Sequence, residues 1–335
     1  MNKTKYLSLW IKRFLTEHLI NNRNLSMNTL ASYRDTFRLI IPYIAEKKSK
    51  PIDRLLVEDL SVDLVKDFLS YIEKHRKCSI STRNQRLAAI HAFAKFVAPN
   101  CIDFIEWSRV IRMIPLKKAP KNTITYLDKM EMDALLNEPE RKTKQGQRDY
   151  TLILLLYNTG ARANEIAQMT IADFSFTQRK NGLSTVLIKG KGNKQRRCPL
   201  WQQTVDQLIL LIKERESSEH VFLNRQKQPI TRFGIYDIVE KYADMVSAKT
   251  PAVGDKRISP HTIRHTTATH LLQSGVDINT IRAWLGHVSI NTTNIYTEID
   301  IEMKAKALST CEVGVNKKST PWRDNQDLMT FLDSL

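Results

Sequence analysis

The sequence has few of the residues on which several classes of protein depend. Its 335 residues include only four cysteines, and no two of them form a C-x-x-C pair. This scarcity excludes a zinc ribbon and a disulfide framework, so we expect free thiols in a reducing cytosol. The four are Cys78, Cys101, Cys198 and Cys311.

Long hydrophobic runs are also missing. No apolar stretch reaches the length that crosses a membrane, and the polar N-terminus lacks the apolar region of a signal peptide. Internal repeats and low-complexity tracts are absent too. Since 42% of the residues are hydrophobic, the chain can still build cores for two ordinary domains. We therefore expect a folded cytoplasmic protein with no membrane partner.

Acidic residues are scarce beside basic ones. Asp and Glu number 35 against 52 Lys and Arg, which gives a formal net charge of +17. Such a balance favours a polyanionic partner, and nucleic acid is a better interpretation than solubility alone. The basic excess is larger in the first third of the chain, which is the better candidate for an electrostatic clamp.

Helical periodicity dominates residues 1–114, which we interpret as a small α-helical DNA-binding bundle. Helices are predicted over 5–19, from Ser26 to near Pro42, over 60–75 and over 79–97. Two pairs of arginines fall on polar faces of this bundle, where they could be solvated or could contact DNA. The pairs are Arg34 with Arg38 and Arg83 with Arg86.

Residues 115–124 hold two prolines and three lysines without periodicity, which is typical of a linker. A second domain over 125–308 then opens with Asp128 and Glu131, a capping-box pattern. Next come a buried helix over 148–159 ended by Gly160, a β-hairpin with strands 183–188 and 194–200, and helices near 201–215 and 231–247. The predicted fold is mainly α, with a small β-sheet in this second, mixed α/β domain and a tail over 309–335.

The hairpin turn is strongly basic. Lys191, Lys194 and Arg196 lie at or beside it, so it is either a solvated loop or a finger that touches phosphates. It is not a P-loop, because the P-loop spacing and the closing Lys-Ser/Thr pair are absent. Upstream, Arg162 follows the buried helix directly, with Glu165 close enough to orient it. A purely structural Arg-Glu pair is the alternative.

The stretch from Ser259 to Tyr296 concentrates groups suited to phosphate chemistry. Ser259 can cap a helix whose first turn contains Pro260, and on that helix His261 and Arg264 project from one face. Gly286 breaks the next helical run, so His287 lies at a corner and Tyr296 on a new element.

Histidines 261, 265 and 270 raise the alternative of a metal site. His261 and His265 are four apart, as in H-E-x-x-H, but Thr262 occupies the position of the Glu base. No carboxylate is suitably placed either, so we expect no metal and no cofactor.

Together these residues form an inventory for phosphodiester cleavage by a tyrosine. A phenol has a pKa of about 10, so it needs positive neighbours or a base to act as a nucleophile. Two arginines can clamp the non-bridging oxygens of the transition state, and a lysine can protonate the leaving alkoxide. The inventory is Arg162, Lys191, His261, Arg264, His287 and Tyr296.

The order and spacing of these motifs resemble the tyrosine recombinase family, also called phage-integrase-type recombinases, and especially its Xer-like members. The matching pieces are T-G-A-R-A-N-E at 159–165, G-K-G-N-K-Q-R at 190–196, H-T-I-R-H-T-T-A-T-H-L-L at 261–272, L-G-H at 285–287, and Tyr296. Ala161 and Ile263 differ from common family residues, but both are apolar replacements.

The resemblance implies a role for each residue. Tyr296 would attack the scissile phosphate and form a 3′-phosphotyrosyl link, Arg162 and Arg264 would hold its oxygens, and Lys191 would act as general acid. His261 would assist proton transfer and His287 would brace the transition state, with Glu165 behind Arg162. Neither metal nor ATP would be needed.

The resemblance also implies a clamp of two domains around duplex DNA, and a homotetramer that holds two duplexes. A stripe of leucines over 325–335 predicts a terminal helix, and the resemblance implies that this helix docks onto a neighbouring protomer. The alternatives are a catalytically silent DNA-binding regulator of the same fold and a type IB topoisomerase. The sequence leaves open the target site, a partner recombinase or accessory DNA-bending protein, and the choice among integration, excision, transposition and multimer resolution.

Overall fold

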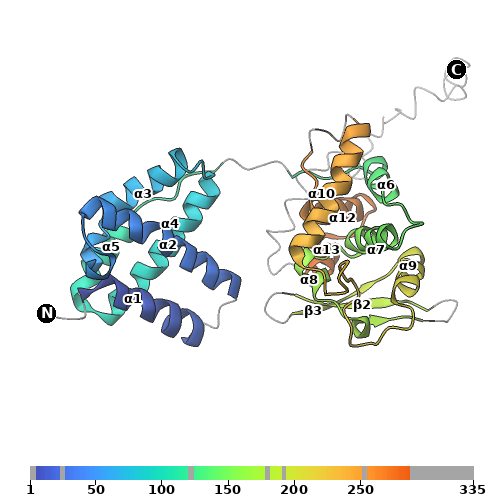
Figure 1. The fold of residues 1–335 in the computed structure, drawn as a ribbon, viewed down its shortest axis with the longest axis horizontal. Coiled ribbons are helices and arrows are strands. Elements are labelled where there is room, and N and C mark those ends of the chain that lie inside the picture. The colour runs from blue at the N-terminus through green and yellow to red at the C-terminus, as the bar shows by residue number, and fades with distance from the viewer. Residues whose placement is uncertain are drawn as a thin grey trace, which may run out of the picture. The chain divides into compact units, whose positions relative to one another are not determined.

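The structure is a computed structural model, and it describes residues 5–22, 27–119, 124–177, 182–190, 194–250, 254 and 256–286. The chain divides into two compact units, residues 1–122 and 123–335 (Figure 1). The described residues are mainly helical with one three-stranded sheet in unit 2, which confirms the predicted fold class. None of the described helices is both long enough and apolar enough to cross a membrane.

Unit 1 is a helical bundle in which serine caps mark the start of two helices. The side chain of Ser61 accepts a hydrogen bond from the Leu64 amide at the start of α3, and Ser79 does the same for Thr82 at the start of α4. The elements are α1 (Leu7–Arg13), η2 (Phe14–Asn22), α2 (Met27–Lys48), η3 (Ile52–Arg54), η4 (Val57–Asp59), α3 (Val62–Lys74), α4 (Ile80–Val97), η5 (Ala98–Asn100), η6 (Ile102–Phe104) and α5 (Ile105–Arg112).

Aromatic rings form the centre of the unit 1 core. Phe14 is fully buried, and its ring centroid lies 5.5 Å from that of Phe93 and 6.0 Å from that of Phe37, both in edge-to-face contact. Trp107 and Ser108 attach α5 to the bundle by donating to the carbonyls of Leu60 and Ala94. The sequence did not predict α5.

The predicted end of α2 near Pro42 is wrong, because the helix continues to Lys48. Proline removes one backbone donor, but its fixed φ is compatible with a helix. Ile40 and Ile44, on either side of Pro42, are 1% and 0% exposed. Their burial keeps this segment on the core, so the helix passes through the proline.

The first residues of the predicted linker are bound to unit 1. The Asn84 side chain donates to the Lys117 carbonyl at 2.7 Å and accepts from the Lys117 amide at 3.1 Å. Arg83 donates to the Pro115 carbonyl, and the Lys117 ammonium pairs with Glu73 at 2.7 Å. Residues 115–117 therefore belong to the packed structure of this unit.

Unit 2 combines helices with an antiparallel sheet of order β1-β2-β3, in which Ile188 lies opposite Arg196. In Figure 1 the sheet lies along the lower edge of the unit, with helices above it. The elements are α6 (Lys129–Asn137), α7 (Lys144–Thr159), α8 (Ala163–Ala167), η7 (Ile171–Asp173), β1 (Phe174–Ser175), β2 (Thr185–Lys189), β3 (Gln195–Pro199), α9 (Gln202–Ile212), α10 (Arg232–Lys249), α12 (Pro260–Gln273) and α13 (Ile278–Leu285).

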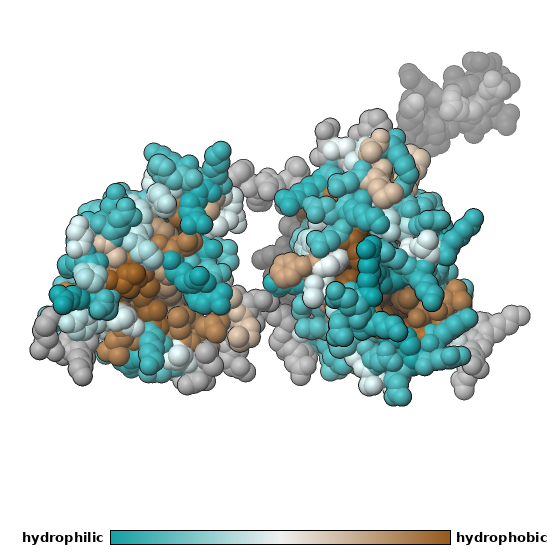
Figure 2. All heavy atoms as spheres, viewed as in Figure 1, coloured by the Kyte–Doolittle hydropathy of each residue, from teal (hydrophilic) through white to brown (hydrophobic). Residues whose placement is uncertain are grey.

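Helix α7 is the buried centre of unit 2, as its apolar run predicted. Leu152, Ile153 and Leu155 are each 0% exposed, and the helix packs against α9 and α12. The capping box of Asp128 and Glu131 at the start of α6 is also present. Hydrophilic residues cover most of the face of unit 2 that Figure 2 shows. A rigid core thus supports the segments that carry the candidate site.

Candidate functional site

The C-terminal end of α7 places Arg162. Gly160 ends the helix with φ +58°, a left-handed conformation that favours glycine. A Cβ at this position would lie 2.6 Å from Cδ2 of Leu285, so the turn is also closely packed. Arg162 follows in extended conformation and becomes the residue that precedes α8.

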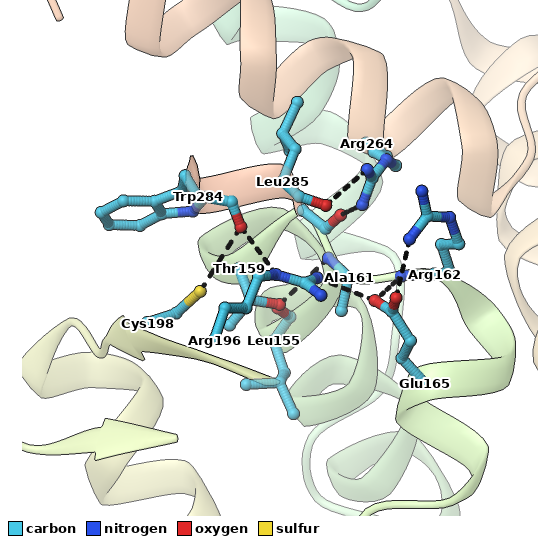
Figure 3. Close-up of polar contacts among 11 residues, drawn as sticks. Leu155, Thr159, Ala161, Arg162, Glu165, Arg196, Cys198, Arg264, Trp284 and Leu285 are labelled. Carbon is cyan, nitrogen blue, oxygen red and sulfur yellow. Dashed lines mark hydrogen bonds and ion pairs between the residues drawn. The ribbon is translucent and has the colours of Figure 1, made fainter. Parts of the chain in front are cut away.

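Glu165 fixes the Arg162 side chain. Its Oε1 accepts from Nη1 of Arg162 at 2.8 Å, and its Oε2 accepts from the Arg162 amide at 2.9 Å (Figure 3). The Arg162 side chain remains 40% exposed, whereas that of Glu165 is 4% exposed. A buried carboxylate therefore holds an accessible guanidinium, which is the contact that the sequence predicted.

The carboxylate stays charged in spite of its burial. Burial raises the pKa of Glu165, but hydrogen bonds and charge from Arg196, followed by bonds from Arg162, outweigh this effect and hold its pKa below the ordinary value. An ionised Glu165 can anchor two guanidiniums at once.

Helix α12 supplies the second arginine. Ser259 caps this helix and Pro260 lies in its first turn, as predicted. Arg264 is only 2% exposed, and it donates through Nη1 to the Gly160 carbonyl at 2.6 Å and through Nη2 to the Leu285 carbonyl at 2.7 Å (Figure 3). Arg264 thereby joins the ends of α7 and α13 at one point.

The positive charges of Arg264 and Arg162 both act on His261. Loss of hydration is the largest cause that lowers its pKa, and the charges of Arg264 and then Arg162 lower it further. The bond from Arg264 to the carbonyl of Gly160, two residues before Arg162, places the first turns of α12, which carry His261 and Arg264, beside the segment of Arg162. A lowered pKa keeps the imidazole neutral near pH 7, so the ring can accept a proton.

His265 packs beside His261, and the ring centroids are 4.6 Å apart in edge-to-face contact. Burial, then His261 and Arg264, lower the pKa of His265 to about 4. Among the described residues, no cluster of three or more His, Cys, Asp or Glu side chains is placed to hold a metal ion.

The His265→Asn variant tests how the neutral imidazole of His265 affects the pH dependence of the free energy of unfolding. Because the folded pKa lies below the unfolded value of about 6.5, His265 contributes stability that is complete above pH 6.5 and is lost as pH falls toward 4. We expect the difference in free energy of unfolding between wild type and variant to shrink by on the order of 2–3 kcal/mol between pH 7 and pH 4. Denaturant titrations across that range would measure it, and two parallel stability curves would contradict the expectation.

The predicted phosphate contact of Arg196 needs correction. Its side chain is only 10% exposed, and it donates through Nη2 to Glu165 and through Nε to the Trp284 carbonyl. These bonds direct the guanidinium into the unit, because β3 turns Arg196 toward the same face as the buried Cys198. The alternation of β3 was the signal from which this orientation could have been inferred.

The other predicted DNA contacts differ in exposure. Arg34, Arg38 and Lys194 are exposed, and Arg34 pairs with the neighbouring Asp35. Arg86 is partly buried and donates to the Ser32 carbonyl and the Thr36 hydroxyl. DNA contact by these four residues stays a prediction.

Arg83 does not lie on a polar face as predicted, since it is only 7% exposed. Its bond to the Pro115 carbonyl holds it against the start of the linker. Direct DNA contact by this guanidinium is therefore disfavoured.

Three predicted catalytic residues, Lys191, His287 and Tyr296, lie outside the described residues, as does the predicted terminal helix over 325–335. The residues directly before Lys191 and His287 are described. Gly190, the residue before Lys191, donates its amide to the Lys194 carbonyl at 2.8 Å. Gly286 ends α13 with φ +66°, immediately before His287.

Comparison with known proteins agrees with this geometry. Residues 125–303 match the phage integrase family, and residues 11–99 match the phage integrase N-terminal SAM-like domain. The integrase/recombinase y4rC of Sinorhizobium fredii is 33% identical over 338 residues, with 100% of both chains covered. Tyrosine recombinase XerD of Halalkalibacterium halodurans is 28% identical over 83% of this chain and 89% of that protein.

Solved structures show the same fold. The XerH site-specific recombinase bound to difH substrate is 25% identical, with a TM-score of 0.65 over 91% of this chain and 95% of that chain. The Tn1549 transposon integrase in complex with transposon right end DNA has a TM-score of 0.68 at 16% identity, over 90% of this chain and 99% of that chain.

Proposed function

This chain belongs to the phage integrase family of tyrosine recombinases, and on that premise we propose that it cleaves and rejoins duplex DNA at specific sites through a 3′-phosphotyrosyl intermediate. The observation that carries the proposal is the bond from Arg264 to the Gly160 carbonyl, which joins the start of α12, with His261 and Arg264, to the distant segment that carries Arg162. A lone Arg162–Glu165 pair would be an ordinary structural contact. A second arginine and a histidine of lowered pKa beside it support the proposal that the pair belongs to a phosphate site.

The proposed reaction begins with attack of the Tyr296 oxygen on the scissile phosphorus. His261, held neutral by its surroundings, takes the phenolic proton. Arg162, His287 and Arg264 stabilise the charge that develops on the non-bridging oxygens. The buried Arg264 can take part because a guanidinium carries five N–H donors, more than its bonds to the Gly160 and Leu285 carbonyls use. Lys191 protonates the departing 5′ oxygen, which leaves the DNA 3′ phosphate on the tyrosine. The 5′ hydroxyl of a second DNA end then attacks this link and displaces the tyrosine.

The energy of the phosphodiester bond is retained in the protein–DNA link, so this chemistry calls for neither metal nor ATP. We expect the two units to close around double-stranded DNA and four protomers to assemble on two duplexes, through the segment over 325–335. Arg34, Arg38, Arg86 and Lys194 are the proposed phosphate contacts, and the cytoplasm is the proposed location. Whether the reaction also requires a partner recombinase or an accessory DNA-bending protein is an open question.

Because the target site is not known, the proposal is tested with a pool of DNA sequences. The protein is incubated in EDTA with randomised duplexes that carry a nick, so that cleavage releases a short fragment and cannot be reversed. We expect a covalent protein–DNA adduct that survives denaturation, and sequencing of the trapped DNA gives the preferred site. An adduct that forms only with a divalent metal ion, or binding of one sequence without any adduct, would overturn the proposal. The latter result would favour the silent regulator.

A further inference from the structure

We propose that Arg196 is a positioning residue for DNA cleavage, an inference that rests on the proposed function. Arg196 holds the carboxylate that orients Arg162 and, with the same guanidinium, the C-terminal end of α13. It thus sets the relative position of groups from α8, the hairpin and α13.

Arg196 is the second residue of β3 and lies opposite Ile188. Nη2 donates to Oε2 of Glu165 at 2.8 Å, and Nε donates to the Trp284 carbonyl at 2.7 Å (Figure 3). Both acceptors are fixed: Glu165 is 5% exposed, and the Trp284 carbonyl belongs to a helix. A planar guanidinium can serve two such acceptors at set angles, whereas a lysine is a single point charge.

The end of α13 is held by two arginines on consecutive carbonyls. Arg196 binds the carbonyl of Trp284, and Arg264 binds that of Leu285. The last carbonyls of a helix lack partners within the helix and carry its negative dipole, so cations stabilise them. The chain continues from this end through Gly286 to His287, so the two arginines fix the point from which His287 starts.

Two glycines that precede predicted catalytic residues pack against this network. A Cβ on Gly286 would lie 3.2 Å from Nη1 of Arg196. A Cβ on Gly190, the residue before Lys191, would lie 3.2 Å from Oε1 of Glu165 and 3.7 Å from Nη1 of Arg196. The backbone therefore approaches Arg196 closely just before each of these catalytic positions.

Removal of Arg196 would disturb Arg162 through their shared carboxylate. Glu165 would keep Arg162, whose side chain is 40% exposed, and would lose a cation that is 10% exposed. Charge pairs weaken as water reaches them, so the remaining pair would hold the carboxylate less firmly. Arg162 would then lose the orientation on which clamping of a phosphate depends.

The test compares Arg196→Met and Arg196→Lys with Arg197→Met. Arg197 is the next residue of β3 and is exposed, so its replacement removes the same charge from the opposite face of the strand. Each full-length variant is assayed for melting temperature, for affinity to the trapped site, and for the rate of adduct formation at saturating protein. The rate is measured with a normal scissile phosphate and with a methylphosphonate, which is uncharged and depends less on arginines that neutralise its oxygens.

We expect Arg196→Met to bind its site normally and to form the adduct about 100-fold more slowly on the normal phosphate, since a displacement near 1 Å at a catalytic group has that effect. On the methylphosphonate substrate, the rate of adduct formation by Arg196→Met should fall much less below the wild-type rate. Arg196→Lys should show the same pattern of rates. If the methionine variant does not fold, the lysine variant provides the test. Arg197→Met should react at close to the wild-type rate.

Equal rates for the variants at 196 and 197 would overturn the inference while the proposed function stands. Equal losses on the two substrates would also overturn it, because general damage to the fold affects both alike. A wild type that forms no adduct would overturn the proposed function and this inference with it.

Discussion

The Tyr296→Phe variant is expected to bind its DNA site with wild-type affinity and to form no covalent adduct. The substitution removes one oxygen atom, and that oxygen is the proposed nucleophile. Binding is measured by gel mobility shift on an intact site, and adduct formation on the nicked substrate under denaturing conditions. Tyr236→Phe is the matched control, since Tyr236 is 43% exposed on α10. An adduct in the Tyr296 variant, or its loss in the control, would contradict the assignment.

Three other tyrosines of unit 2 are occupied by structural contacts. The Tyr157 hydroxyl is 2.7 Å from Nδ1 of His270, and the Tyr150 hydroxyl accepts from Gln203 at 2.6 Å. The Tyr242 hydroxyl donates to the buried Asp149, and burial followed by that carboxylate raises the pKa of Tyr242 far above its ordinary value. A raised pKa makes a phenol harder to ionise, so Tyr242 is a poor candidate for the nucleophile.

The Arg264→Ala variant should lose both activity and stability. Loss of one charged donor to a transition-state oxygen slows such reactions by about 10²–10³-fold. The variant also leaves the Gly160 and Leu285 carbonyls without the buried donors that Arg264 supplies. Each unmade bond costs about 1–3 kcal/mol, so we expect about 3 kcal/mol of destabilisation in total. Calorimetry should show a melting temperature of unit 2 lowered by about 6–12 °C.

The Arg162→Ala variant is the matched control for Arg264→Ala. It should show a similar loss of cleavage, because Arg162 is the other half of the proposed clamp. Its side chain is 40% exposed, and Glu165 would keep Arg196, so its effect on stability should stay below about 1 kcal/mol. Equal destabilisation by the two substitutions would show that the burial of Arg264 does not join α7 to α13 as described.

Much of the fold could be predicted from local patterns. Asp128 with Glu131 and Ser259 with Pro260 mark helix starts through bonds within one turn of the chain, so the sequence alone reveals them. The first hairpin strand was likewise apparent from its β-branched and apolar residues, and the glycine-containing segment after it indicated a return strand. Glu165 was predicted beside Arg162 because the two residues are three positions apart in the sequence.

Features that depend on distant contacts were not predicted. Arg196 lies beside two other basic residues and therefore looks like a phosphate contact, until the fold brings Trp284, 88 positions away, to its side. Arg83 is similar, because its acceptor at Pro115 lies 32 positions away. Pro42 is typical of a helix end, and only the burial of Ile40 and Ile44 explains why α2 continues. The sequence predicted which arginines take part in function, whereas the structure showed which of them face inward.

The link between protein and DNA tests the central claim most directly. The trapped adduct is digested with trypsin and nuclease, and the peptide that carries the nucleotide is identified by mass spectrometry. The account predicts the peptide 283–304, in which Tyr296 is the sole tyrosine, joined through its oxygen to a DNA 3′ phosphate. A nucleotide on any other residue, or a link to a DNA 5′ phosphate, would contradict it.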